Sequence, residues 1–166
     1  FAALVRERGA AKVVCGLPVH FDGSVSQLEF NGYDYDSLRF GGRLTEKTFN
    51  GHVRADDPAL RFDFQGEVGF NPERPHYDFD LDLIHADLAR MHLNRRDSVS
   101  VLSALVEARA SGRTLDDLNG KVTVGDVVYR YNADTLHTTR LTLDGQNTAG
   151  SKYLSVQSEF ADATFR

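Results

Sequence analysis

The sequence predicts an all-β protein built from short antiparallel strands. Three observations support this: apolar and polar residues alternate with a period of two, turn dipeptides separate the alternating runs, and helical periodicity is scarce. Strands with one apolar and one polar face are typical of antiparallel sheets, which leave one face in water.

Composition limits the class of protein further. The chain has 166 residues, 41% hydrophobic and 26% charged, as in one globular domain or one segment of a longer repetitive protein. Its net charge of −5 provides no basic surface for nucleic acid. No apolar run approaches the roughly 18 residues of a membrane span, so this segment is not expected to be transmembrane. Because the chain opens at Phe1 without a leader and ends at Arg166 on a strand-like run, we expect an excised segment.

The first twenty residues differ from the rest. Ala2–Ala11 fits two or three turns of helix, so residues 1–20 form an uncertain flank and the β region is expected from residue 21 to 166. Turn signals then recur, several at about ten-residue spacing, as expected for short meandering strands. They are Asp22-Gly23, Asn31-Gly32, Gly41-Gly42, Asn50-Gly51, Asn71-Pro72, Asn119-Gly120 and Asp144-Gly145.

The clearest strand patterns lie in the middle and at the end of the chain. Apolar residues alternate with polar ones over 60–70, 77–83, 141–143 and 154–160. Asp87–His92 fits a single helical turn. Residues 98–110 fit both a helical stripe and a strand, and the period alone does not decide between them.

A weak internal repeat also recurs, with the pattern apolar-x-Gly-x-apolar. A glycine on the apolar side of a strand lets two backbones approach or relieves twist. The repeat occurs at residues 21–25, 40–44, 49–53, 64–68 and 118–122.

No constellation of catalytic residues is present, so we expect no enzyme and no catalytic residue. Cys15 sits among aliphatic residues, and neither a nucleophile elbow nor a phosphate-binding loop occurs. Asp78-x-Asp80-x-Asp82 begins like a calcium loop, but Leu83 and Ala89 occupy positions that need Gly and Glu. The six histidines lack metal-ligand spacing, so no metal and no cofactor are expected.

Three stretches together resemble the TamB family of translocation and assembly proteins, in the form found in the Bacteroidetes. They are residues 115–124 (LDDLNGKVTV), 152–165 (KYLSVQSEFADATF), and 77–83 (YDFDLDL) with 86–93 (ADLARMHL). The resemblance covers residues 20–166 and is best over 77–166. TamB proteins are related to AsmA-like and other repeating-β-groove lipid-transfer proteins.

The resemblance implies an elongated, curled antiparallel β-sheet that forms an apolar groove (β-taco-like), with at most a minor helix near the N-terminus. It favours a strand over Ser100–Ala110. It also implies the periplasmic part of an inner-membrane-anchored protein of a Gram-negative bacterium. Such a protein would serve outer-membrane biogenesis by moving phospholipid, by assisting outer-membrane protein assembly and secretion, or both. Its partners would be phospholipid acyl chains and, through the full-length protein, a TamA-like outer-membrane barrel protein.

The residues expected to line this groove share one parity within each strand, so they would contact acyl chains through water exclusion and dispersion. They are Phe62, Phe64, Val68, Phe70, Phe79, Leu81, Leu83, Val122, Val124, Leu141, Leu143, Leu154 and Val156.

Two other functions fit the residues. One is a structural or protein-docking β module that uses exposed strand edges. The other is a carbohydrate-binding β-sandwich that stacks sugars on Tyr33 or Tyr35. Without the resemblance, the patterns favour a closed sandwich over an open groove, because an apolar face must be covered by something.

Overall fold

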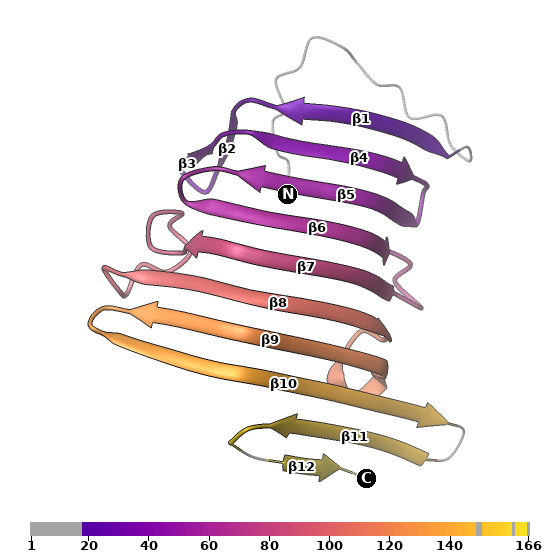
Figure 1. Ribbon diagram of the computed structural model, residues 1–166. Helices are drawn as coiled ribbons and strands as arrows, with labels where there is room; N and C mark the ends of the chain where they lie inside the picture. Colours follow the sequence, from indigo (N-terminus) through magenta and orange to yellow (C-terminus); the bar gives the residue numbers. More distant parts are fainter. Residues whose placement is uncertain (1–17, 149–150, 161, 166) are drawn as a thin grey trace.

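The computed structural model describes residues 18–148, 151–160 and 162–165, which fold almost entirely as β-strands (Figure 1). The first six strands are β1 (Val19–Val25), β2 (Leu28–Phe30), β3 (Tyr33–Tyr35), β4 (Leu38–Leu44), β5 (Thr48–Asp56) and β6 (Leu60–Gly69). The others are β7 (His76–Asp87), β8 (Ser100–Ser111), β9 (Asn119–Tyr131), β10 (Asp134–Thr148), β11 (Ser151–Ser158) and β12 (Asp162–Phe165). A 3₁₀ turn, η1 (Leu115–Asp117), precedes β9. The helix expected over residues 2–11 lies outside the described residues, as does Cys15.

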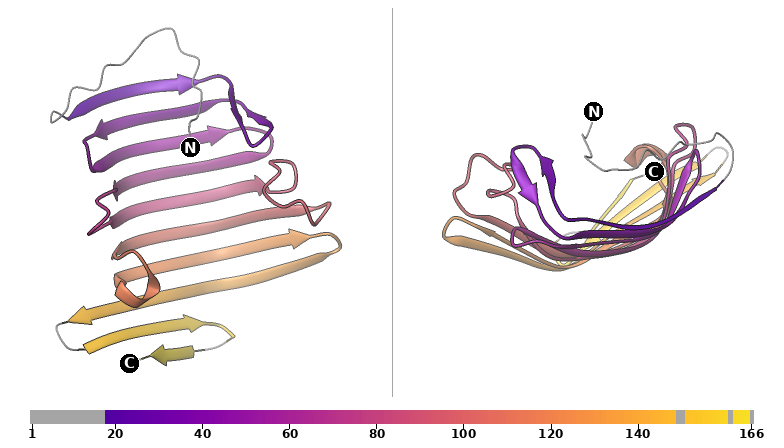
Figure 2. Two further views of the ribbon diagram at one scale, coloured as in Figure 1. Left: turned by 180° about the vertical axis from the view of Figure 1, so that it is seen from behind. Right: turned by 90° about the horizontal axis from the view of Figure 1, so that it is seen from above.

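Ten of the strands form one antiparallel sheet in the order β1-β4-β5-β6-β7-β8-β9-β10-β11-β12. Neighbours in the sheet are neighbours along the chain except at β1 and β4, where the separate β2–β3 hairpin is inserted. The sheet is not closed, and it curls so that one face becomes concave (Figure 2). This confirms the all-β, curled antiparallel groove and excludes a closed sandwich for the described residues.

The ambiguous segment after residue 98 is a strand, β8, which pairs with β7 and β9 over most of its length. Sheet pairing overrides helical periodicity here, because both neighbours offer full ladders of hydrogen bonds. The single helical turn expected over Asp87–His92 is a hydrogen-bonded turn, in which Met91 N–H donates to the carbonyl of Asp87 at 3.0 Å.

Most of the predicted glycine turns were wrong. Only Asn31-Gly32 forms the expected tight hairpin turn, with φ of 54° and 76° at the two positions, between β2 and β3. Asn71-Pro72 also lies in a turn, after β6. The other dipeptides lie inside strands β1, β4, β5, β9 and β10. Apart from Gly41, which pairs with Asp22 and His52 on the polar face, their glycines lie on the apolar face of the sheet and do not reverse the chain.

The strands are longer than short meandering strands would be, and three register shifts bend them. These occur between Arg61 and Phe62, Leu83 and Ala86, and Ser103 and Leu105. An irregularity of this kind bends a strand and increases its local twist. The shifts lie near the ends of β6, β7 and β8 that face the β2–β3 hairpin, where the sheet rises toward that side of the concave face (Figure 2).

The fully buried core is small and lies at one rim of the sheet. Tyr35, Ala59, Ala86 and Met91 form a cluster of buried residues, and Leu28, Leu38, Leu60, Leu83 and Leu102 are among the partly buried residues that pack against it. The hairpin and the turns after β7 therefore cover only one edge of the apolar face.

Candidate functional site: the apolar groove

Strand register places a continuous apolar surface on the concave face. Residues that pair across antiparallel strands share a face, so each row can be followed from strand to strand. The central row is Gly23, Phe40, Val53, Phe64, Leu81, Val106, Val124, Leu141 and Ser158. The next row is Phe21, Gly42, Gly51, Gly66, Phe79, Ala108, Val122, Leu143, Val156 and Ala163. Among the described residues, neither row contains a charge.

Two flanking rows widen this surface. One runs Val25, Leu38, Ala55, Phe62, Leu83 and Ala104. The other runs Val19, Leu44, Phe49, Val68, Tyr77, Ala110, Gly120, Gly145 and Leu154. At about 4.8 Å per strand, ten strands give a trough about 40 Å long. We call these four rows the groove.

The structure places twelve of the thirteen predicted lining residues in the groove. All twelve are partly exposed and none is fully buried, as on the inner face of an open trough. The thirteenth, Phe70, lies one residue beyond β6 and is 54% exposed. Period-two alternation therefore identified the apolar face of these strands correctly, but it extended β6 one residue too far, to Phe70.

Sequence reasoning missed an aromatic ladder across the first half of the groove. The rings of Phe21 and Phe49 stand 6.0 Å apart, Phe49 and Phe64 6.1 Å, and Phe64 and Phe79 5.1 Å between centroids. Phe40 joins at 5.7 Å from Phe21. The signal was in the sequence, because Phe21, Phe40, Phe49 and Phe64 each begin one unit of the Phe-x-Gly-x-apolar repeat.

The glycines of the same repeat pair directly with one another. Gly42 lies opposite Gly51, and Gly51 lies opposite Gly66. A Cβ added at Gly51 would meet the Cα of Gly42 at 2.8 Å, so the backbones approach too closely for any larger residue. This is the close approach expected of glycine on the apolar side of a strand. Phe21 and Phe79 of the ladder flank these three glycines in the same row, Phe21 opposite Gly42 and Phe79 opposite Gly66.

The opposite, convex face is polar and charged. Asp78, Asp80 and Asp82 are exposed on it, and Arg109 from β8 binds the first two. Both carboxylate oxygens of Asp80 accept from the guanidinium at 2.9 Å, and Asp78 lies 2.9 Å from Nε. The bond to Asp80 is the main reason that the pKa of Arg109 is raised. The calcium-like spacing is therefore part of a charged, water-facing strand with an arginine partner.

One rim of the groove is organised by a buried carboxylate, Asp57, which is 1% exposed. It accepts hydrogen bonds from the Tyr33 hydroxyl at 2.9 Å and from the amides of Asp36 at 2.9 Å and Ala59 at 2.7 Å. Burial alone would raise the pKa of Asp57, but these donors outweigh it and hold the pKa below its usual value. Asp57 thus fastens the hairpin to the sheet.

A second set of polar contacts fixes the turns after β7 beside that hairpin. The Asn31 side chain donates to the carbonyl of His92 at 2.9 Å. Deeper in, the Asn94 amide donates to Ser100 at 3.0 Å and to Asp97 at 2.9 Å. Ser100 is completely buried and also contacts the Tyr129 hydroxyl at 2.9 Å. These bonds connect the turns after β7 to the hairpin, to β8 and to β9 at this rim.

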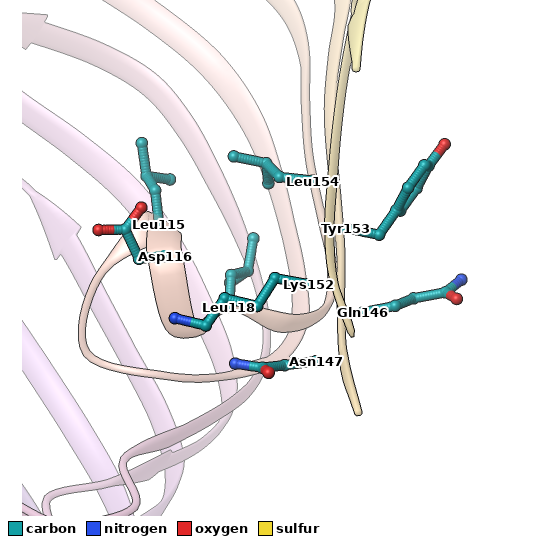
Figure 3. A pocket seen from close by; sticks show the side chains of 8 residues that line it. All are labelled: Leu115, Asp116, Leu118, Gln146, Asn147, Lys152, Tyr153 and Leu154. Carbon is teal, nitrogen blue, oxygen red and sulfur yellow. The ribbon is translucent and has the colours of Figure 1, made fainter. Parts of the chain in front are cut away.

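The other rim is formed by η1, which lies over β10 and β11 and leaves a cavity of about 440 Å³ (Figure 3). Asp117 holds the turn by accepting hydrogen bonds from the amides of Arg113 at 2.8 Å and Thr114 at 2.6 Å. The bond from Thr114 is the main reason that the pKa of Asp117 is lowered. Leu118 packs above Gly145 of the groove, 2.9 Å from where a Cβ would lie.

The aromatic residues considered for sugar binding are used for packing. Tyr35 is buried, and its ring packs edge-on against Tyr33 with centroids 4.8 Å apart. The guanidinium of Arg90 lies 5.7 Å from the centroid of the Tyr33 ring. These two rings therefore offer no flat open surface on which a sugar could stack.

The described residues contain no group of three or more His, Cys, Asp or Glu that could hold a metal ion. Within the same residues, no helix is long and apolar enough to cross a membrane.

Comparisons with known proteins found no match: no family model, no curated protein and no solved structure corresponds to this chain.

Proposed function

We propose that this chain is a segment of a periplasmic β-groove protein that carries phospholipid acyl chains along its concave face in outer-membrane biogenesis. One observation supports the proposal most: an uninterrupted apolar surface crosses the whole sheet and remains partly open to solvent. A ligand that covers this face removes apolar area from water, which is worth about 0.8 kcal/mol for each methylene group. The location, the inner-membrane anchor of the full-length protein and a barrel partner rest on the resemblance to TamB proteins.

The chemistry of the groove selects this occupant. Its four rows contain phenylalanine, valine, leucine, alanine and glycine, together with Tyr77 and Ser158, and no charged residue. Such a surface offers few hydrogen-bonding groups to a sugar or a nucleotide, and it suits a flexible hydrocarbon that needs only exclusion of water. The charged convex face keeps the outside of the trough hydrated.

The test is lipid extraction and mass spectrometry of the purified protein. We expect co-purified phospholipid, and a strong loss of it in the double variant Phe64→Asp, Leu81→Asp, which places two charges opposite one another in the central row. The matched control is Gln65→Asp, which adds a charge to the convex side of the same strand. Circular dichroism checks that each variant keeps its sheet.

A protein that carries no lipid, or that carries equal amounts in the groove variant and the control, would refute lipid binding by the groove. That result would direct attention to the structural or docking module instead.

A further inference from the structure

The cavity beneath η1 combines an apolar wall with polar groups. Leu115, Leu118 and Leu154 line it, and Leu154 is also the last residue of a groove row. The cavity is therefore continuous with the groove. Its volume, about 440 Å³, lies within the range of small-molecule pockets.

Lys152 places a positive charge at this rim of the groove. It pairs with Asn147 across β10 and β11, one step beyond the Gly145–Leu154 pair. In Figure 3 the Lys152 side chain reaches from β11 toward η1, and Tyr153 and Gln146 point to the other side of the sheet. The ammonium group therefore stands at the boundary between the apolar surface and solvent.

Asp116 provides an opposite charge on η1, which lines the same cavity, and Figure 3 shows its carboxylate on the side of η1 turned away from β10 and β11. Its neighbour Asp117 is engaged by Arg113 and Thr114, whereas the Asp116 side chain has no hydrogen bond or ion pair within the described residues. Lys152 and Asp116 are likewise not paired with each other in this part of the chain. Lys152 on β11 and Asp116 on η1 thus carry opposite charges beside one cavity, and both side chains are free to bind a ligand.

We propose that this cavity binds the zwitterionic head group of a phospholipid, with Lys152 on the phosphate and Asp116 on the ammonium group. This inference rests on the proposed function, because the acyl chains of the same lipid would lie in the groove. Asn147 adds a neutral hydrogen-bond donor beside Lys152.

The charge balance favours a zwitterion over a purely anionic lipid. An anionic head group would satisfy Lys152 but leave the Asp116 carboxylate beside a second negative charge. A zwitterion pairs both groups, and charge-assisted hydrogen bonds of this kind are stronger than neutral ones. The net charge of −5 agrees with this choice, because it gives the chain no overall electrostatic attraction to anionic lipids.

Calorimetric titration of the purified, delipidated protein tests the assignment with three probes. These are lauroyl lysophosphatidylethanolamine, lauroyl lysophosphatidylglycerol with the same chain, and phosphoethanolamine without a chain. We expect the ethanolamine lysolipid to bind about tenfold more tightly than the glycerol lysolipid, the difference of one charge-assisted bond. Phosphoethanolamine alone is expected to bind much more weakly.

Two variants separate the roles of the two charges. Lys152→Met should weaken both lysolipids about tenfold, and Asp116→Asn should weaken only the ethanolamine lysolipid and so abolish the preference. The matched controls are Lys121→Met and Asp144→Asn, a pair that lies opposite one another on the convex face, and these should leave binding unchanged.

Equal affinity of the native protein for the two lysolipids would overturn the proposal, as would phosphoethanolamine binding as tightly as its lysolipid. If Lys152→Met and Asp116→Asn changed nothing while phospholipid still co-purified and depended on Phe64 and Leu81, the head-group site would fail and the groove would stand. If no lysolipid bound and no phospholipid co-purified, both proposals would fail together.

Discussion

At the scale of single residues, Asp57 accepts the hydrogen bonds that hold the β2–β3 hairpin against one rim of the groove. Three donors from β3, from the turn after it and from the turn after β5 meet on this one buried carboxylate. A buried charge is tolerated only when it is hydrogen-bonded, and here the bonds from Tyr33 and Asp36 also connect two separate segments.

Replacing Asp57 tests how much these hydrogen bonds stabilise the folded protein. We expect Asp57→Asn to lower the free energy of unfolding by about 2–3 kcal/mol, because an amide replaces a charged acceptor and places an NH₂ against backbone donors. Urea denaturation followed by circular dichroism measures the change. Asp56→Asn is the matched control, since the neighbouring Asp56 side chain is exposed, and it should be close to neutral.

The same residue predicts a dependence on pH. The pKa of Asp57 is lower in the folded protein than in the unfolded chain, so its stabilisation is fully present above the unfolded pKa of about 4. The unfolded chain binds the proton first as the pH falls, and the stabilisation is lost as the pH drops through the folded pKa. The stability gap between the native protein and Asp57→Asn should therefore narrow below about pH 4. A gap that stays constant down to pH 3 would contradict this account.

At the scale of elements, the glycine pairs explain how β4, β5 and β6 curl together. Gly66 has φ of +144°, and a Cβ there would meet the carbonyl oxygen of Asp78 and the Cα of Phe79 on β7. Only glycine adopts this backbone conformation without strain. The strand can therefore approach its neighbour closely while it still presents Phe64 and Val68 to the groove.

We expect Gly66→Ala to destabilise the protein by about 1–3 kcal/mol, through backbone strain and the displacement of β7. Gly125→Ala is the matched control, because it lies in a strand of the same sheet, where an added Cβ would contact only the Thr139 carbonyl oxygen, at 3.6 Å. Thermal unfolding of the two variants checks the difference. Equal melting temperatures would show that the close approach at Gly66 does not shape the sheet.

The elements also show what the sequence could predict and what it could not. Alternation identified the faces of β6, β7, β10 and β11, because a side-chain period of two is local information. Asn50-Gly51 was wrongly predicted to be a turn. Gly51 instead pairs with Gly42 and Gly66 on the neighbouring strands, and such pairing cannot be seen in the local sequence. The η1 cavity was not predicted, since it depends on the folding of residues 115–118 over β10 and β11.

At the scale of the whole molecule, the two faces of the sheet differ in polarity. The concave rows are apolar across every strand of the sheet, and the convex face carries paired charges such as Arg109 with Asp80 and Arg54 with Asp63. Surface ion pairs of this kind contribute little stability each, so their main effect is to keep the outer face in water. A sheet with this division either holds a hydrophobic ligand or exposes apolar area to solvent.

Site-directed spin labels distinguish these two states in the intact molecule. We expect nitroxides at Phe64 and Leu81, in a Cys15→Ser background, to be accessible to molecular oxygen and to become less mobile when phospholipid is added, since acyl chains then pack against them. Labels at Gln65 and Asp80 on the convex face of the same two strands should not change. Electron paramagnetic resonance measures both mobility and accessibility. Labels at Phe64 and Leu81 that are already immobilised and inaccessible to lipid would mean that the concave face is closed, because a groove that carries acyl chains must admit them to its central row.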